Sequence, residues 1–361
     1  MQESQASQVS PRVTEPFLER YQIGPRAGRL SLELVSDCNE FCVHCYAESG
    51  PKGRARATEA NTLTGREWCS ILVDGARFGF TRVQFIGGEP TLHPSLGTLV
   101  ALAHQLGMQI EVYSNLLDVS SDLWKTFVLN RVSLATSLYS LEPRIHDQIT
   151  RTTGSHAATV ANLRKARELG LKVRASVIKV HPSQDIDPLV AWLESEGVHQ
   201  VTVDRMRRIG RARTPIGDAD LFRELCGRCS DGGATVSTVG DVFPCVFCRV
   251  LGVGNIRVAP LSAVLTSEAW FSLQDRLRSV FSASSAGATC GPSEKDNGCG
   301  PTNRSSAMYE GCGPNEKETP SCGPYRRHSS TQSSCAPDAP TRPDEGCGPT
   351  RSGVGTSRRS N

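Results

Sequence analysis

The chain has 361 residues, of which 38% are hydrophobic, and this is enough for the core of one large domain plus an appendage. Its 40 Lys and Arg and 37 Asp and Glu residues leave a net charge of +3 with no long run of either sign, which argues against nucleic-acid and anionic-membrane partners. Segment 1–16 lacks the apolar core of a signal peptide, and no stretch approaches the roughly 20 apolar residues of a membrane span. We therefore expect a soluble, cytoplasmic protein.

The region from Arg29 to about Arg205 alternates β-like runs with amphipathic helical stretches, which predicts βαβ units around a parallel sheet. Thr64 and Glu67 have the spacing of a capping box at the first helix. Six strands are expected at 30–35, 82–86, 109–114, 132–137, 172–178 and 200–205, and helices are expected near 65–78, 95–106, 120–129, 157–169 and 186–196.

Six such units could form either an open sheet or an incomplete barrel, and the positions of unusual residues favour the barrel. These residues follow the carboxyl ends of successive predicted strands, where parallel α/β barrels assemble their active sites. They are Cys38, the run Gly87-Gly88-Glu89-Pro90, the pair Ser114-Asn115, and Ser137. The predicted fold class is therefore α/β, with a partial (β/α)6 TIM-type barrel.

The domain organisation follows from changes in composition. We expect a lead-in over 1–28, the barrel over 29–210, a small cysteine-rich extension over 211–281 and a tail over 282–361. Gly, Pro, Ser and Cys dominate the tail, which repeats Cys-Gly-Pro, and apolar residues nearly vanish there. The tail is therefore predicted to be disordered.

The 14 cysteines are better explained as metal ligands than as disulfides, because thiols stay reduced in a long chain without an export signal. Cys69 stands alone and is interpreted as a buried helical thiol. The others form three groups: Cys38, Cys42 and Cys45; Cys226, Cys229, Cys245 and Cys248; and Cys290, Cys299, Cys312, Cys322, Cys335 and Cys347 in the tail.

The first group places three thiols in one loop directly after a strand. Three thiolates can hold three irons of a cubane and leave the fourth iron open. A zinc site would need a fourth ligand, for which His44 is available, but the spacing is unusual for zinc. This loop resembles the Cys-x3-Cys-x2-Cys signature of the radical S-adenosylmethionine (radical SAM) superfamily, which has an aromatic residue beside its last cysteine, here Tyr46.

The resemblance, which covers about residues 29 to 281, implies a catalytic role for Cys38, Cys42 and Cys45 as ligands of a 4Fe-4S cluster. In that superfamily the open iron chelates S-adenosyl-L-methionine, and one electron cleaves it to methionine and a 5′-deoxyadenosyl radical. The radical then abstracts a hydrogen atom from the substrate. The resemblance also implies a one-electron reductant such as flavodoxin or ferredoxin as a partner.

The run Gly87 to Pro90 resembles the GGEP motif of the superfamily, which holds the methionine amino group of the cofactor. Its glycines would let the backbone approach a ligand closely, and its glutamate could meet an ammonium group; a Gly-Gly turn with a surface glutamate is the alternative. Other candidates, which could instead be ordinary turn or salt-bridge residues, are suggested by the resemblance. The cofactor-binding candidates are Tyr46, Gly87, Gly88, Glu89, Pro90, Ser114, Asn115, Ser137 and Arg174.

The second cysteine group surrounds a probable hairpin turn at Gly240. Two Cys-x2-Cys pairs, Cys226 with Cys229 and Cys245 with Cys248, make a valid zinc site. However, Cys-x10-Gly-x4-Cys resembles the opening of the SPASM and shorter twitch extensions of radical SAM enzymes, which carry auxiliary clusters. The later cysteine series of a full SPASM domain is absent. We therefore predict a twitch-like extension with one auxiliary 4Fe-4S cluster for electron transfer, and zinc remains the alternative.

An auxiliary cluster would make substrate oxidation reasonable, whereas hydrogen donation by a cysteine would give epimerisation. The predicted function is an oxidoreductase or epimerase that acts on a sugar, cyclitol or nucleoside intermediate in natural-product biosynthesis. The alternative substrate is a ribosomally made peptide; such maturases commonly carry an N-terminal recognition domain, whereas 37 residues precede Cys38 here. A non-enzymatic iron–sulfur or zinc scaffold is a third reading, against which the cysteine triad and GGEP argue together.

Overall fold

The computed structural model describes residues 28–51, 61–181, 184–214, 218–229 and 232–285. Two compact units divide the chain, Met1–Ala307 and Met308–Asn361, and all described residues belong to the first. The predictions for the lead-in, for nearly all of the tail and for the six tail cysteines therefore lie outside the described residues. None of the described helices is long and apolar enough to cross a membrane.

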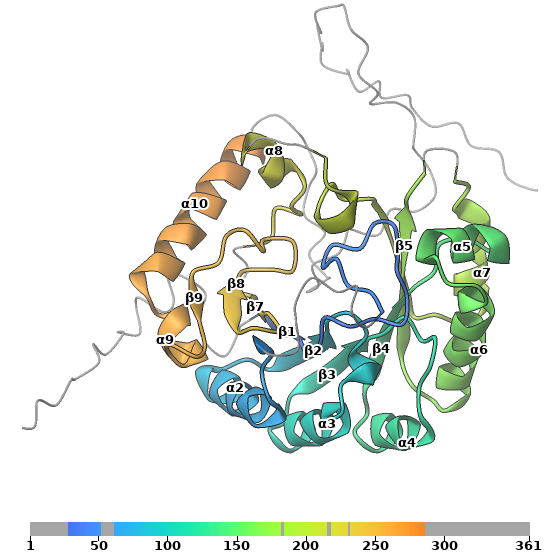
Figure 1. Ribbon diagram of the computed structural model, residues 1–361, viewed down its shortest axis with the longest axis horizontal. Coiled ribbons are helices and arrows are strands. Elements are labelled where there is room, and N and C mark those ends of the chain that lie inside the picture. The colour runs from blue at the N-terminus through green and yellow to red at the C-terminus, as the bar shows by residue number, and fades with distance from the viewer. Residues whose placement is uncertain (1–27, 52–60, 182–183, 215–217, 230–231, 286–361) are drawn as a thin grey trace, which may run out of the picture. The chain divides into compact units, whose positions relative to one another are not determined.

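Six parallel strands form the centre of the fold, and they pair in the order of the sequence from β1 to β6. The connecting helices line the outside of the curved sheet (Figure 1), so the predicted fold class, an α/β partial barrel, is confirmed. The strands are β1 (Arg29–Glu33), β2 (Arg82–Ile86), β3 (Gln109–Tyr113), β4 (Ser133–Ser137), β5 (Val173–Lys179) and β6 (Gln200–Arg205). The helices are α2 (Gly65–Phe78), α3 (Leu96–Gln105), α4 (Ser121–Leu129), α5 (Pro143–Thr150), α6 (Ser155–Glu168) and α7 (Asp187–Ser195), with short 3-10 turns η2 (Pro90–Leu92) and η3 (Gly210–Ala212).

The strands alternate between an apolar outer face and a polar inner face. On β1, Leu30 and Leu32 are fully buried in the hydrophobic core, whereas Arg29 and Ser31 line an internal cavity. This alternation follows from the two-residue period of a strand, which sends successive side chains to opposite faces. The barrel interior can therefore carry chemistry, because its apolar packing is on the helix side.

One helix, α5, is not among the helices expected from the sequence. It begins with Pro143, a residue well suited to the first position of a helix, and ends at Arg151 in the left-handed conformation. The Asp147 carboxylate accepts hydrogen bonds from the backbone N–H groups of Gly154 and His156, at 2.6 and 2.9 Å. Asp147 thus joins α5 to the start of α6.

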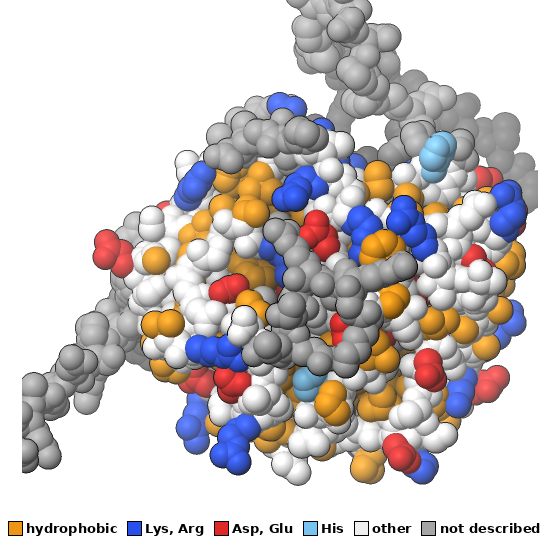
Figure 2. Space-filling view, viewed as in Figure 1, with side chains coloured by type: hydrophobic (Ala, Val, Ile, Leu, Met, Phe, Trp, Pro, Cys, Tyr) orange, Lys and Arg blue, Asp and Glu red, His pale blue; other side chains and the backbone are white. Residues whose placement is uncertain are grey.

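The extension continues the barrel sheet. Strand β7 (Ala234–Val236) pairs in parallel with β1, and β8 (Asp241–Phe243) and β9 (Gly254–Asn255) follow in antiparallel pairing. The predicted hairpin turn at Gly240 lies between β7 and β8, with φ of 93°. Three further helices complete this part: α8 (Asp218–Arg223), α9 (Leu261–Leu265) and α10 (Glu268–Ser285). On the face shown in Figure 2, acidic and basic side chains are interspersed without an extended patch of either sign.

Candidate active site

A cavity of about 540 Å³ lies inside the barrel and brings both predicted cysteine groups to one space. Cys38, Cys42 and Cys45 line it from the loop that follows β1, while Cys226 and Cys245 line it from the extension. The two groups are almost 200 residues apart in the sequence, and the parallel pairing of β7 with β1 brings them together. Residues of both cysteine groups therefore border the same cavity.

Cys38, Cys42 and Cys45 do not belong to any group of ligand atoms close enough together to bind one metal ion, either among themselves or with a fourth ligand, among the described residues. Among the described residues, the group of three or more ligand atoms within 4.8 Å of one another is Cys229, Cys245 and Cys248. The His44 Nδ1 atom is buried without a hydrogen-bond partner, but it joins no such group with the triad. This arrangement does not suit a single zinc ion at the triad; three separated thiols suit a multi-iron cluster.

The electrostatic surroundings of Cys38 and Cys42 favour the neutral thiol. Burial raises the pKa of Cys38 and Cys42, and the nearby carboxylates of Glu89 and Glu40 raise it further. Burial also raises the pKa of Glu40 to about 7, and the Cys42 thiol donates to its carboxylate at 3.2 Å. Binding of a metal cluster would release these protons, because metal ligation requires thiolates.

The Gly-Gly pair is required by close packing against the start of the cysteine loop. An added Cβ at Gly88 would lie 2.0 Å from the Asp37 carbonyl oxygen. The N–H of Gly88 donates to the Val35 carbonyl at 2.6 Å, and the N–H of Glu89 donates to the Asp37 carbonyl at 2.8 Å. Gly87 and Gly88 also line the cavity. They hold the loop after β1 against the end of β2.

The predicted site residues Glu89, Pro90 and Ser114 do not line the cavity. They stabilise the loops that form its wall. Glu89 is 1% exposed, is not among the residues that line the cavity, and accepts backbone N–H bonds from Thr91 at 3.0 Å and Asn115 at 2.8 Å. Pro90 begins η2, and the Ser114 Oγ accepts from a backbone N–H. In the structure Glu89 thus links two loops and does not present a free carboxylate to the cavity.

Asn115, Ser137 and Tyr46 do line the cavity. The Asn115 Nδ2 donates to the Asn39 Oδ1 at 2.7 Å and lies 3.8 Å from the Cys38 Sγ. The Ser137 Oγ is 2.9 Å from the Tyr113 hydroxyl. The Tyr46 ring packs edge-on against Phe247, with ring centroids 5.6 Å apart.

Arg174 also lines the cavity but is already paired. Its guanidinium forms two hydrogen bonds with the Glu111 carboxylate, at 2.7 and 2.8 Å. The structure therefore gives it the salt bridge that was the alternative to a cofactor contact.

The second cysteine group is buried in a small apolar cluster with Leu225, Leu273 and Leu277. The Cys245 Sγ lies 3.4 Å from the Cys229 Sγ and 3.5 Å from the Cys248 Sγ, and Cys226 is hydrogen-bonded to Cys229. Sulfurs around one tetrahedral ion with metal–sulfur bonds of about 2.3 Å lie about 3.8 Å apart. A four-iron cluster would need wider spacing, since each cysteine binds a different iron.

Two connections around the site were not anticipated from the sequence. The Arg211 guanidinium donates to the carbonyls of Cys42 and Ser49 and lies 3.7 Å from the centre of the Phe41 ring. The sequence signal that could have indicated this contact is the run Gly210-Arg211, which follows the last barrel strand.

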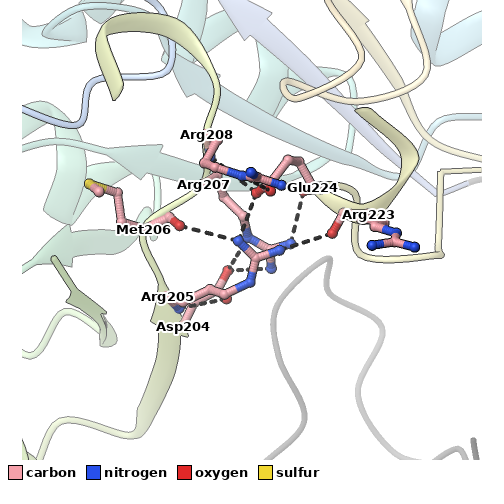
Figure 3. A network of polar contacts seen from close by, with 7 residues as sticks. All are labelled: Asp204, Arg205, Met206, Arg207, Arg208, Arg223 and Glu224. Atoms are coloured by element: carbon pink, nitrogen blue, oxygen red, sulfur yellow. Dashed lines mark hydrogen bonds and ion pairs between the residues drawn. The ribbon is translucent and has the colours of Figure 1, made fainter. Parts of the chain in front are cut away.

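The other connection joins β6 to the extension through a buried glutamate, Glu224 (Figure 3). Arg205 and Arg208 each pair with its carboxylate, at 2.7 and 2.9 Å. Arg207 pairs with Asp204 at 2.6 Å and donates to the Glu224 carbonyl. This network fixes the segment that leads to Cys226.

Residues 32–195 match a sequence model of the Radical SAM superfamily. The chain is 28% identical over 195 residues to Fe-coproporphyrin III synthase of Methanosarcina barkeri, covering 53% of this chain and 47% of that protein. It is 24% identical over 172 residues to an S-adenosylmethionine-dependent nucleotide dehydratase of a Thermoplasmatales archaeon, covering 46% of this chain and 59% of that protein. The matches thus span about half of these relatives.

The fold is similar to that of Streptococcus suis SuiB bound to S-adenosylmethionine, with a TM-score of 0.58, 16% sequence identity, and coverage of 71% of this chain and 70% of that chain. SuiB bound to its precursor peptide SuiA gives a TM-score of 0.58 at 15% identity, covering 76% of this chain and 75% of that one. At such identity the likeness concerns the fold. Together with the matched sequence and the cysteine loop at the end of β1, it leads to one conclusion: residues 32–195 of this chain form a Radical SAM superfamily domain.

Proposed function

We propose that this chain is a radical SAM enzyme in which Cys38, Cys42 and Cys45 hold a 4Fe-4S cluster and S-adenosyl-L-methionine binds in the adjoining cavity. The observation that carries the proposal is that the three thiols of the matched domain line one internal cavity without converging on a single ion. When bound, the cluster would supply the electron that cleaves the cofactor to a 5′-deoxyadenosyl radical, which abstracts a substrate hydrogen atom. An external one-electron donor such as flavodoxin or ferredoxin would reduce it.

The chain's own residues would shape this site in three ways. Gly87 and Gly88 would offer backbone groups at the cavity wall, beside the loop that they anchor. Asn115 would fix the start of the loop through Asn39. Ser137, held by the Tyr113 hydroxyl, would offer a polar contact to the cofactor from the end of β4.

The second cysteine group would hold an auxiliary metal centre beside the substrate. On the resemblance of the cysteine spacing to a twitch extension, we favour a 4Fe-4S cluster held by Cys226, Cys229, Cys245 and Cys248, which would supply electron-transfer chemistry. The close approach of Cys229, Cys245 and Cys248 instead favours one zinc ion. Metal analysis separates the two alternatives.

The substrate would be a small molecule, dehydrogenated or epimerised in the cavity. A volume of about 540 Å³ is in the range of small-molecule sites. The first candidate is a sugar, cyclitol or nucleoside natural-product intermediate, and the nucleotide-directed relative is in keeping with it. Maturation of a ribosomally made peptide is the second candidate, favoured by the likeness in fold to SuiB with its precursor peptide.

Formation of 5′-deoxyadenosine tests the proposal directly. Anaerobically reconstituted protein with S-adenosyl-L-methionine and a strong reductant should form it, and changing Cys38, Cys42 or Cys45 to Ala should abolish it. Cys69→Ala is the matched control, because Cys69 is a free thiol on α2 outside the cavity lining. Product formation by the triple Ala variant at the parental rate would refute the proposal, and a parent that binds iron but forms none would favour a scaffold.

A further inference from the structure

The loops that carry the two cysteine groups contact each other through an aromatic pair. Tyr46 directly follows Cys45, the last cysteine of the first group, and its ring meets the ring of Phe247 edge to face, with centroids 5.6 Å apart. Phe247 lies between Cys245 and Cys248 of the second group. Both aromatic side chains line the cavity. The contact therefore joins two loops that are each predicted to bind metal.

Each ring belongs to a tight turn that begins at a cysteine. In the first loop the Glu48 N–H donates to the Cys45 carbonyl at 3.3 Å. In the second the Cys248 N–H donates to the Cys245 carbonyl at 2.9 Å. A metal ion or cluster would restrain both turns, because each metal–sulfur bond fixes the residue that supplies the sulfur. The relative position of the two rings therefore depends on metal at both groups.

Both aromatic residues are confined by further packing. An added Cβ at Gly210 would lie 2.3 Å from the carbonyl oxygens of both Cys45 and Tyr46, so the backbone after β6 packs directly on the first turn. Phe247 packs against the apolar cluster around the second cysteine group. The Arg207 guanidinium, part of the network in Figure 3, lies 5.8 Å from the centre of the Phe247 ring. A displacement of either ring would therefore disturb the loop that carries the other.

A second contact between the two segments is ionic. Glu33 ends β1, the strand that leads to the first loop, and its buried carboxylate pairs with the Arg249 guanidinium, with one N–O distance of 2.6 Å. Arg249 directly follows Cys248, and Phe247 directly precedes it. The residues on both sides of this cysteine are thus in contact with the segment of the first group.

We propose that the contact between Tyr46 and Phe247 couples the two metal centres, so that the second cysteine group, once it holds metal, keeps the first loop closed on its own metal. Phe247 is then a positioning residue, which acts on the first group through Tyr46. Such coupling is reciprocal, because occupancy of either site stabilises the other by the same free energy. It applies to zinc and to a cluster alike, since either would be held by the cysteines on both sides of Phe247. This inference rests on the proposed function and adds that its two centres depend on each other.

The test measures amide hydrogen exchange over residues 38–50 in the full-length, anaerobically reconstituted protein, with metal analysis of each variant. Changing the four cysteines of the second group to Ala should speed this exchange about threefold to tenfold, which is the value of one aromatic pair. Phe247→Leu removes the ring and keeps an apolar side chain, and it should speed the exchange by a similar factor with the second group loaded. Added to the four Ala changes, Phe247→Leu should have no further effect, because both act through one contact.

Phe222→Leu is the matched control for this substitution. Phe222 packs against the same apolar cluster, but its ring contact is with Phe281. The control should exchange over residues 38–50 as the parent does. An equal effect of Phe222→Leu and Phe247→Leu would show general weakening of the extension and would overturn the coupling. Should the four-Ala protein not fold, Cys245→Ala takes its place, since the Cys245 Sγ lies close to two other sulfurs of the group.

The reciprocal experiment changes the three cysteines of the first group to Ala. Exchange over residues 245–251 should then rise by a similar factor, but not when Phe247→Leu is already present. The coupling alone is overturned if the effects of Phe247→Leu and of emptying either group multiply fully, or if Phe247→Leu exchanges like the parent. A parent whose first group binds no iron overturns the proposed function.

Discussion

At the scale of single residues, one arginine completes the loop that carries the cysteine triad. Besides its guanidinium contacts with the carbonyls of Cys42 and Ser49, the Arg211 N–H donates to the Cys45 carbonyl at 2.9 Å. A planar guanidinium can donate to two carbonyls and lie over Phe41 at once, which a lysine ammonium cannot reproduce. We therefore regard Arg211 as a positioning residue for the triad.

We predict that Arg211→Met loosens this loop without unfolding the barrel. Loss of the guanidinium bonds should favour local opening by about 2 kcal/mol, or about thirtyfold faster amide exchange over residues 38–50. Iron should also be lost faster to a chelator, with Arg211→Lys intermediate. The control is Arg257→Met, since Arg257 donates to the carbonyls of Asn61 and Thr62 and does not line the cavity. Equal exchange and equal iron loss in the two Met variants would contradict the role.

The residue scale also marks a limit of sequence reasoning. The triad, Asn115 and Ser137 could be predicted to share a site because all follow strand ends, and the structure does bring them to one cavity. The hydrogen-bond partners of Glu89 and the ion-pair partner of Arg174 could not be predicted from the sequence. They depend on which backbone donors and carboxylates face these two side chains after folding.

At the scale of elements, the six barrel strands were predictable and their extension was not. Alternation and helix caps are local signals; β2 and β6 match the prediction in both bounds, and the capping box of Thr64 with Glu67 is present. In contrast, the pairing of β7 with β1 joins Ala234 to Leu30, and nothing in a three-residue strand specifies so distant a partner. Helix α10 was missed because the cysteine-rich composition before it suggested only turns.

The β7–β8 hairpin gives an element-scale prediction. Gly240→Ala should cost about 1–2 kcal/mol of stability, because Gly240 has a positive φ, and an added Cβ would also lie 2.9 Å from the Asn255 side chain. As β8 leads directly to Cys245, metal bound at the second cysteine group should fall as well. Gly107→Ala is the matched control, with φ of 75° and nothing near the added Cβ. Chemical denaturation and metal analysis together check the prediction; full metal at the second group in Gly240→Ala would refute the link.

At the scale of the whole molecule, the two cysteine groups belong to one continuous sheet. β1 leads to the triad, and the β7–β8 hairpin beside β1 leads to the second group. The ion pair between the buried Glu33 and the half-buried Arg249 makes a further connection, since Glu33 ends β1 and Arg249 follows Cys248. The cavity between the two cysteine groups therefore has walls from the barrel and from the extension.

The last prediction concerns the residues after Ser285. Both cysteine groups and the buried core of the described residues precede that point, so a chain that ends at Ser285 should fold and keep both metal centres. With two cubane clusters, the full-length and shortened proteins should each bind about eight irons per chain. Changing Cys226, Cys229, Cys245 and Cys248 to Ala should halve the iron in both. About four irons plus one zinc in the parent would instead make the second centre a zinc site, and metal loss only on shortening would make tail cysteines ligands.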